Sequence, residues 1–219
     1  LLGLLCVDVF FFEPNVLLTK SQKLEIPNWN KDLNGFKIAL VTDIHLGTRF
    51  VDLKKLDKIV KTINAKNPDL IVIGGDLDAK SIANKKYSTA QIANILKNLK
   101  SKHGVIAVMG NHDYVPDKIV KEIYAKSNIK ILEQEDFFII HNGKSIRLVG
   151  FKDLWHFKSK PSEVVGSKYK TTPTITLAHN PDSFPQMPEF VSLTLSGHTH
   201  GGEIVLPFIG SFFIPSEYG

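Results

Sequence analysis

Residues 36–45 read FKIALVTDIH, a short apolar run that ends in an acid and a histidine. A run of roughly 4–8 apolar residues closed by turn residues predicts a buried strand. Because ligands of open α/β sheets bind beyond the carboxyl ends of the strands, we expect such terminal residues to meet at one edge of one sheet. Four later runs follow the same pattern: LIVIGGD at 70–76, GVIAVMGNHD at 104–113, TITLAHN at 174–180 and VSLTLSGHTH at 191–200.

The composition is that of a globular protein. The chain has 219 residues, 43% hydrophobic and 22% charged, which suits one domain with a full core. The 27 Lys and Arg against 22 Asp and Glu give a net charge of +5, which fits an anionic substrate, an anionic membrane surface or ordinary solvated lysines. No basic stripe with interleaved aromatics indicates a nucleic-acid groove, and no obligate protein partner is evident. The single cysteine, Cys6, excludes an internal disulfide and a thiolate zinc site.

Residues 1–12, LLGLLCVDVFFF, are apolar except for Asp8. A membrane-spanning helix needs about 20 apolar residues, so this stretch alone is too short. Because the chain does not begin with Met, we interpret the stretch as the remnant of a membrane anchor or signal segment. The alternative is an apolar strand or helix packed on the domain. We therefore divide the chain into this segment and one domain at residues 13–219.

From residue 36 onward the pattern predicts alternating strands and helices. A helix is expected from an N-cap at Asp52 to the Asn67-Pro68 pair, and further helices near residues 92–99 and 116–126. This alternation predicts βαβ crossovers and a mainly parallel sheet. The second half is dominated instead by strand-like runs, at residues 129–132, 137–140, 145–149, 174–177, 191–195 and 203–205.

A helix-rich half and a strand-rich half predict an α/β fold with two packed sheets and helices outside. The stretch HNGK at 141–144 is typical of a hairpin turn. Residues 16–18 and 24–26 are expected to form edge strands. Residues 78–90 and 150–172 are expected to be variable loops around the site, and His103 and His141 are expected at the surface.

The residues after the first two strands suit metal binding. Asp43 and His45 are two apart, so on an extended chain both face the same way and can ligate one ion. Asp76 follows two glycines, where the backbone can approach an ion closely, and its two oxygens can bridge two cations. Taken singly, each residue has an ordinary alternative as a turn-capping Asp or a surface His.

The later motifs add further donors. Asn111 offers a neutral carbonyl oxygen, and His112 beside it is the candidate proton donor, with Asp113 placed to orient it by accepting the other ring N–H. The imidazoles of His179, His198 and His200 complete the set. Together these donors suffice for two metal ions, and two-metal sites suit displacement at phosphorus.

In this order the motifs Asp-x-His, Gly-Asp, Gly-Asn-His-Asp, a lone His after a strand and Gly-His-Thr-His resemble the calcineurin-like metallophosphoesterases. The resemblance covers about residues 36–202. The chain is more similar still to a bacterial, membrane-associated phosphodiesterase branch. The shared features are Glu-Pro at 13–14, His-Asn-Pro-Asp at 179–182, Gly-Gly at 201–202, and Leu-Pro and Ser-x-Tyr near the end.

This resemblance implies a four-layer αββα sandwich with two packed mixed β-sheets and a dinuclear metal site. A water bridging the ions would lose a proton and attack phosphorus, while His112 donates to the leaving oxygen. Mixed Asp, His and Asn ligation favours Mn²⁺, with Fe or Zn²⁺ as alternatives. Glu203 and Ala79 depart from the branch pattern, at positions that are not ligands. The implied ligands are Asp43, His45, Asp76 and His200 for the first ion, and Asp76, Asn111, His179 and His198 for the second.

We therefore expect a hydrolase of phosphodiester or pyrophosphate bonds in a small-molecule or lipid-linked substrate. The alternatives are a broad-specificity phosphomonoesterase and a pyrophosphatase of the kind that cleaves UDP-diacylglucosamine in lipid A synthesis. A non-enzymatic scaffold is disfavoured because every ligand and His112 are present. Arg49 and His156 are candidate substrate contacts. The branch implies association with the bacterial inner membrane, on a side that the sequence does not identify.

Overall fold

The computed structural model describes residues 15–26, 29–78, 86–201, 205–206, 210–211 and 214–218. The expected anchor segment at 1–12, residues 79–85 of one expected loop, and Glu203 lie outside the described residues. The elements, in chain order, are η3 (Lys31–Leu33), β1 (Ile38–Val41), α2 (Leu53–Ala65), β2 (Leu70–Ile73), α3 (Thr89–Leu96), β3 (Val105–Ala107), α4 (Asp117–Lys126), β4 (Lys130–Ile131), β5 (Glu135–His141), β6 (Lys144–Gly150), α5 (Pro161–Val165), β7 (Thr174–Leu177), η4 (Pro181–Gln186), β8 (Leu193–Leu195), β9 (Val205–Leu206) and β10 (Gly210–Ser211).

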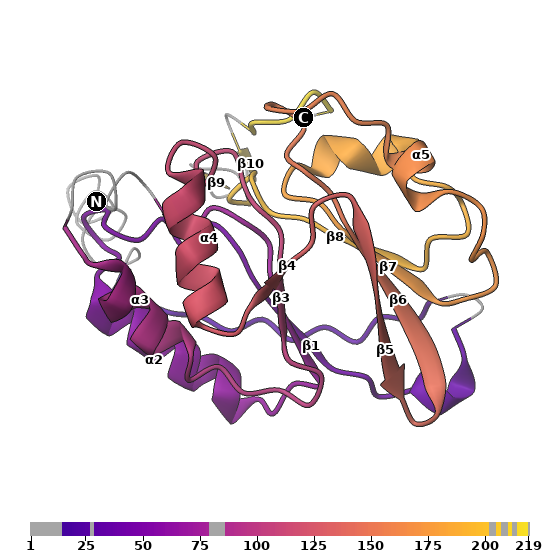
Figure 1. Ribbon diagram of the computed structural model, residues 1–219, viewed down its shortest axis with the longest axis horizontal. Coiled ribbons are helices and arrows are strands. Elements are labelled where there is room, and N and C mark those ends of the chain that lie inside the picture. The colour runs from indigo at the N-terminus through magenta and orange to yellow at the C-terminus, as the bar shows by residue number, and fades with distance from the viewer. Residues whose placement is uncertain are drawn as a thin grey trace.

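Two four-stranded sheets face each other, with helices on the outer sides (Figure 1). The second sheet, β5-β6-β7-β8, is mixed, because the β5–β6 hairpin is antiparallel and the other pairs are parallel. The expected αββα sandwich is confirmed. The first sheet, β1-β2-β3-β4, was expected to be mixed, but all of its strand pairs are parallel. The reason is that α2, α3 and α4 each carry the chain back across one face, and such crossovers join parallel strands.

Strand β2 shows why the sequence runs are apolar throughout. Ile71 and Ile73 point into the core beneath α2, α3 and α4, whereas Leu70 and Val72 point into the core between the two sheets. All four side chains are buried, since both faces of the strand are covered. Each such side chain contributes about 1.5–3 kcal/mol on burial. A third, smaller cluster around Phe151 lies under α5 on the outer face of the second sheet.

Local sequence signals placed several elements correctly. Asp52 caps α2, its carboxylate accepting the Lys55 N–H at 2.8 Å. The β5–β6 turn has Asn142 and Gly143 at φ of 49° and 74°, as a tight hairpin requires. The expected edge strands at 16–18 and 24–26 are wrong: these residues join no sheet. The outer edge of β1 stays unpaired within the described residues, and residues 22–26 line the groove beside it instead of joining the sheet.

His103 and His141 are not simple surface residues. His141 is only 6% exposed, and its Nδ1 lies 3.0 Å from His103 Nε2. The edge of Phe36 packs against the His141 ring at a centroid distance of 4.9 Å. His103 precedes β3 of the first sheet and His141 ends β5 of the second. The pair therefore joins the two sheets at the amino end of β3.

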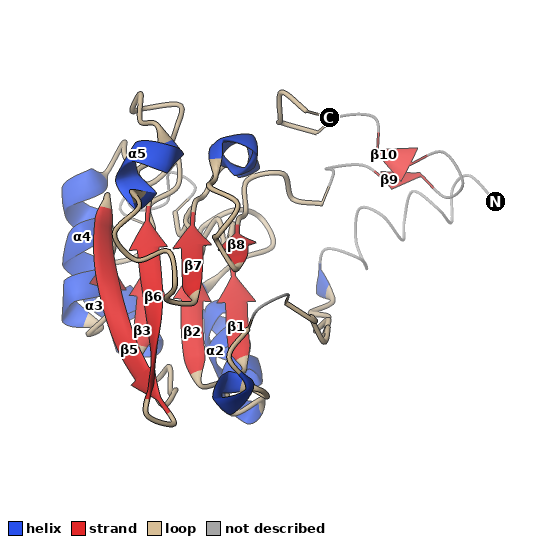
Figure 2. Ribbon diagram, turned by 90° about the vertical axis from the view of Figure 1, so that its right-hand side faces the viewer, coloured by secondary structure: helices blue, strands red, loops and turns tan. Residues whose placement is uncertain are grey.

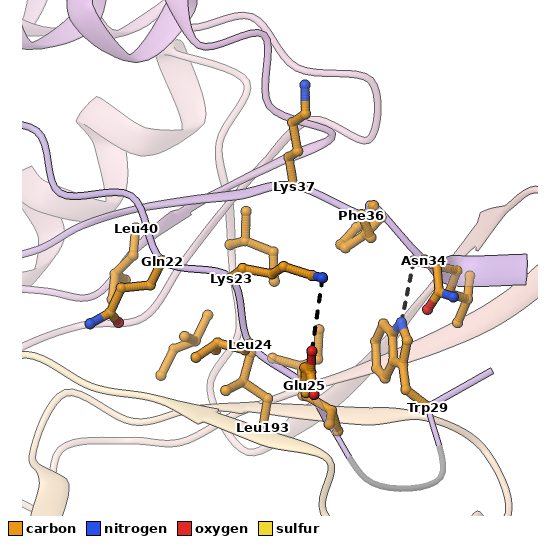
Figure 3. Close-up of a pocket in the computed structure, with 16 residues that line it drawn as sticks. Gln22, Lys23, Leu24, Glu25, Trp29, Asn34, Phe36, Lys37, Leu40 and Leu193 are labelled. Atoms are coloured by element: carbon orange, nitrogen blue, oxygen red, sulfur yellow. Dashed lines mark hydrogen bonds and ion pairs between the residues drawn. The ribbon is translucent and has the colours of Figure 1, made fainter. Parts of the chain in front are cut away.

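A groove of about 760 Å³ follows the open edges of the two sheets, beside β1 and β8 (Figure 3). Its walls are mainly apolar and include Leu24 and Leu193. Trp29 lies in this groove and donates its indole N–H to the Leu33 carbonyl at 3.2 Å. None of the lining residues is a candidate ligand or catalytic residue.

Candidate metal centre

The predicted ligands follow the carboxyl ends of β1, β2, β3, β7 and β8, and Figure 2 shows β1, β6, β7 and β8 running in the same direction. The strand pattern alone suggested that these ends belong to one sheet. They belong to two sheets. Register brings the loops of the first sheet level with one another, because Val41 pairs with Ile73 and Ile73 pairs with Ala107. The donors therefore converge at the end of the sandwich where both sheets terminate.

Asp43, His45 and His200 form one group of donors. His200 Nε2 lies 3.1 Å from His45 Nε2 and 3.3 Å from Asp43 Oδ1. Asp76 Oδ2 lies 3.7 Å from His45 Nε2. These four residues are those expected to hold the first ion.

A second group surrounds His179. Its Nε2 lies 3.1 Å from Asn111 Oδ1, 3.3 Å from His198 Nδ1 and 3.3 Å from Asp76 Oδ2. Its Nδ1 faces the Gly74 carbonyl at 2.8 Å, which orients the ring toward the other donors. Asp76 Oδ2 therefore lies within 4 Å of an imidazole from each group, 3.7 Å from His45 and 3.3 Å from His179.

The loops that present these ligands have an unusual backbone. Among the described residues, nine residues other than glycine have a positive φ, and five of them are candidate ligands: Asp43, His45, Asp76, His198 and His200. This conformation costs roughly 1–2 kcal/mol per residue, and such strain clusters at functional sites. Backbone bonds hold it in place, with Asp43 N donating to Gly75 O and His45 N to Asp76 O, each at 3.0 Å.

Two glycines give the carboxylates room. A Cβ on Gly110 would lie 2.6 Å from Asp76 N and closer still to Asp76 Oδ1. A Cβ on Gly197 would lie 2.5 Å from Asp43 Oδ2 and would also collide with the Thr42 hydroxyl. The glycines of Gly-Asn-His-Asp and Gly-His-Thr-His are thus needed so that the backbone can pass close to the two acids.

The electrostatics couple acids to imidazoles. Burial alone would raise the pKa of Asp43, but hydrogen bonds from His200 and Thr42 and the charge of His179 bring it down to about 2. Burial would likewise raise the pKa of Asp76, and its hydrogen bond with His179 lowers it below the ordinary value. Burial opposes charge on His179, but its hydrogen bond to Asp76 raises the pKa to about 9. A metal ion bound at His179 would therefore have to compete with a proton on this imidazole.

The donor set fits divalent metal ions. His198 Nε2 is buried and has no hydrogen-bond partner among the described residues. Asp43 Oδ1 faces the imidazoles of His45, His179 and His200 at 3.8, 3.9 and 3.3 Å. Buried polar atoms are normally satisfied, so an unpartnered imidazole nitrogen in this cluster suits a cation. In the part of the chain that the structure describes, donor atoms within 4.8 Å of one another occur in three triads: Asp43, His45 and His200; His45, Asp76 and His112; and Asp43, Asp76 and His179.

Asp113 does not lie where the sequence suggested. Its carboxylate is fully buried and accepts four backbone N–H groups: those of Asp76 at 2.8 Å, Gly110 at 3.0 Å, Leu77 at 3.0 Å and Asp78 at 3.4 Å. No hydrogen bond within the described residues joins it to the His112 ring. Burial raises the pKa of Asp113 to about 7, against the opposing hydrogen bond from Gly110. Asp113 therefore clamps the loop of Asp76 to the loop of Asn111.

His112 lies at the exposed mouth of the site. Its ring packs edge-on against His45 at a centroid distance of 5.1 Å, and its backbone N–H donates to Asp76 Oδ1 at 2.9 Å. His112 therefore presents an exposed imidazole beside the donor cluster. The same position also brings its ring nitrogen within ligand distance of the cluster.

The two candidate substrate contacts differ in placement. His156 is exposed, and its Nε2 lies 3.0 Å from the Asn111 carbonyl, beside the centre. Arg49 is also exposed, and its guanidinium lies 5.2 Å from the centre of the Phe50 ring.

Sequence reasoning missed two supporting residues. The Thr42 hydroxyl donates to Asp43 Oδ2 at 2.6 Å, and its signal was a hydroxyl residue just before a candidate ligand. Asp153 is buried after β6, where its Oδ2 accepts the N–H groups of Trp155 and His156 at 2.9 and 3.2 Å. The available signal was the Asp itself, since an Asp in a loop commonly accepts the backbone N–H two residues later.

The sequence of this chain is similar to those of known proteins. Residues 36–202 match the family described as calcineurin-like phosphoesterase. The phosphodiesterase YaeI of Escherichia coli is 31% identical over 187 residues, which cover 83% of this chain and 67% of that protein. The UDP-2,3-diacylglucosamine pyrophosphatase LpxG of Chlamydia muridarum is 24% identical over 243 residues, covering 90% of this chain and 73% of that protein.

A solved structure supports the fold alone. The calcineurin-like phosphoesterase YfkN of Bacillus subtilis matches with a TM-score of 0.52 at 16% identity, over 75% of this chain and 72% of that one. The chain spans only 42% and 50% of the length of two other relatives. With the family match over residues 36–202 and the 31% identity to YaeI, this chain belongs to the calcineurin-like phosphoesterase family.

Proposed function

We propose that this chain is a metal-dependent hydrolase that cleaves phosphodiester or pyrophosphate bonds. The observation that carries the proposal is the convergence of seven donor residues from both sheets, with Asp76 between the two groups. The two groups of donors share Asp76 Oδ2, which suits a dinuclear site. The first ion is assigned to Asp43, His45, Asp76 and His200, and the second to Asp76, Asn111, His179 and His198.

Mn²⁺ is the proposed metal, with Fe or Zn²⁺ as alternatives. Imidazoles outnumber carboxylates among these donors, whereas Mg²⁺ and Ca²⁺ favour shells of oxygen. When bound, two such ions would activate water for attack and neutralise charge on the phosphate. The residues of the chain then have to hold the phosphate and handle the proton of the leaving group.

His112 is the proposed general acid. It is exposed at the mouth, and its backbone N–H is anchored on Asp76, so its ring is held beside the place where phosphorus would lie. A positioned general acid contributes roughly 10²–10⁴-fold in rate. Asp113 acts by positioning the loops of Asp76 and Asn111 and does not contact substrate. Arg49 and His156 are proposed contacts for the remainder of the substrate.

Two relatives suggest the substrate class. YaeI is named a phosphodiesterase and LpxG a pyrophosphatase of UDP-2,3-diacylglucosamine. Both names imply a phosphorus atom with two substituents, so a diester or pyrophosphate in a small or lipid-linked molecule is the leading proposal. A pyrophosphatase of the UDP-diacylglucosamine type is the narrower form, and a broad phosphomonoesterase is the alternative.

We also propose that the protein works at the bacterial inner membrane, with residues 1–12 facing lipid. The support is the apolar sequence of that segment and the lipid-linked substrate in the name of LpxG. In the described part of the chain, every helix is too short or too polar to cross a bilayer. Deleting residues 1–12 should leave turnover of a soluble ester nearly unchanged, whereas a truncation that unfolds would make the segment part of the domain.

The function is tested with a substrate panel. Purified protein with added Mn²⁺ is assayed on a phosphomonoester, an aryl phosphodiester, a cyclic nucleotide and a UDP-lipid pyrophosphate. We expect turnover of the diester or the pyrophosphate to exceed that of the monoester, and Asp76→Asn to abolish it because the shared ligand is weakened. Preference for the monoester would select the alternative, and no turnover of any ester at saturating metal would refute the proposal.

A further inference from the structure

The loop after β6 presents a tryptophan at the candidate centre. The Trp155 ring packs perpendicular to the ring of His198, with centroids 4.4 Å apart and an interplanar angle of 90°. His198 Nδ1 in turn lies 3.3 Å from His179 Nε2, within the second group of donors. Trp155 therefore contacts a candidate ligand directly and lies beside the place where a phosphate would bind.

This tryptophan is held firmly. The buried Asp153 carboxylate accepts the N–H groups of Trp155 and His156, and Asp153 O accepts the N–H of Phe157 at 3.0 Å. On the far side of the loop, Tyr114 packs against the rings of His156 and Phe157 at centroid distances of 5.2 and 5.0 Å. The turn therefore positions the indole before any ligand arrives.

Trp155 nevertheless remains 61% exposed. A tryptophan that only supported His198 would gain most by burying its ring, since an aromatic side chain buries about 150–250 Å² in a core. The edge-to-face contact leaves most of the indole open to solvent beside the donors. A rigid, open aromatic surface next to a phosphate site is the arrangement by which planar rings are stacked.

We propose that Trp155 is a specificity-determining residue that stacks on a planar ring carried by the substrate, of the nucleobase class. This inference rests on the proposed phosphoesterase function and adds the nature of the group attached to the phosphate. A flat indole on a fixed turn offers a stacking surface and no enclosing walls, so it suits a flat ring better than an aliphatic chain. Base stacking on an aromatic side chain contributes roughly 1–3 kcal/mol per base.

The test compares two diesters with the same leaving group. Thymidine 5′-(p-nitrophenyl phosphate) carries a base, and ethyl p-nitrophenyl phosphate does not. With Mn²⁺ present, Trp155→Leu should lower kcat/KM for the thymidine ester by roughly 5- to 150-fold, mainly through KM, and change the ethyl ester little. Trp155→Phe should keep most of the preference, and both variants should retain their Mn²⁺ content. Trp29→Phe, in the groove beside β1, is the matched control and should leave both esters unchanged.

Binding is read separately from turnover. In a Trp29→Phe background Trp155 is the only tryptophan, because the chain has two. With Zn²⁺ in the site, thymidine 5′-phosphate should quench its fluorescence, whereas deoxyribose 5-phosphate should not. Any of three results would overturn the inference. The two ligands could quench the fluorescence equally, or Trp155→Leu could leave the ratio of kcat/KM for the two esters unchanged. Trp155→Leu could also lose its metal and lower kcat/KM equally for both esters. If the wild-type protein hydrolyses neither ester, the substrate panel described above decides the proposed function, and the quenching comparison alone decides the role of Trp155.

Discussion

Asp113→Asn gives the sharpest test of how the two central loops are held. The carboxylate accepts four backbone N–H groups, two on each oxygen. An asparagine has one oxygen, so its NH₂ group must face two of these donors and leave them unsatisfied. Each buried unsatisfied donor costs about 1–3 kcal/mol, which gives roughly 2–6 kcal/mol in total.

Removing the charge offsets part of this loss. Burial raises the pKa of Asp113 to about 7, which means that the ionised carboxyl is itself disfavoured in the folded protein. We therefore expect the lower half of the range, about 2–4 kcal/mol, to be lost from the free energy of unfolding. That is a large share of the roughly 5–15 kcal/mol typical of a domain. Because the clamp positions Asp76 and Asn111, Mn²⁺ content should fall as well.

The assay is urea unfolding at pH 7.5 in EDTA, with metal analysis on separate samples reconstituted with Mn²⁺. Asp69→Asn is the matched control, because Asp69 Oδ2 accepts one backbone N–H, from Lys37 at 2.8 Å, which an amide oxygen can also accept. The control should lose less than about 1 kcal/mol. Suppose that Asp113→Asn unfolds at the same urea concentration as the control and keeps its metal, while kcat falls. Asp113 would then not hold the two loops together, and the original prediction that it orients the His112 ring would be favoured instead.

Three further outcomes are expected. Gly197→Ala should lower Mn²⁺ affinity, because the added Cβ would collide with Asp43. Gly150→Ala is the control: its Cβ would meet the side chain and carbonyl of Leu132 in the core, so it should lower the urea midpoint of unfolding and leave Mn²⁺ affinity unchanged. His112→Ala should lower kcat by roughly 10²–10⁴-fold with metal content near normal, and loss of a metal would place that residue among the ligands instead. Burial and the neighbouring imidazole lower the pKa of His103, so the folded protein disfavours its proton. The contribution of His103 to stability should therefore be lost as pH drops below about 6.5. In EDTA, His103→Gln should remove that contribution, so that the variant gains stability relative to the wild type at pH 5 compared with pH 7.5, as urea midpoints measure.

Local chemistry in the sequence determined much of the fold. The N-cap at Asp52 and the apolar period behind it predicted α2, and Asn-Gly predicted the β5–β6 turn, because each signal acts within a few residues. The apolar run at 174–177 predicted β7 to the residue, since a strand buried on both faces must be apolar throughout. The strand-end motifs also identified which side chains would converge, because parallel strands deliver their carboxyl ends to one side.

Only the tertiary structure decided which partners these residues meet. Asp113 is adjacent to His112 in sequence, yet three of the four amides that its oxygens accept are 35 to 37 residues away, because β2 and β3 lie side by side. The pairing of His103 with His141 likewise depends on how the two sheets face each other. The left-handed backbone at the ligands is imposed by hydrogen bonds between neighbouring loops, which no local pattern contains. Sequence therefore determined the donors and the strands that carry them, whereas long-range packing determined the geometry that turns them into a metal centre.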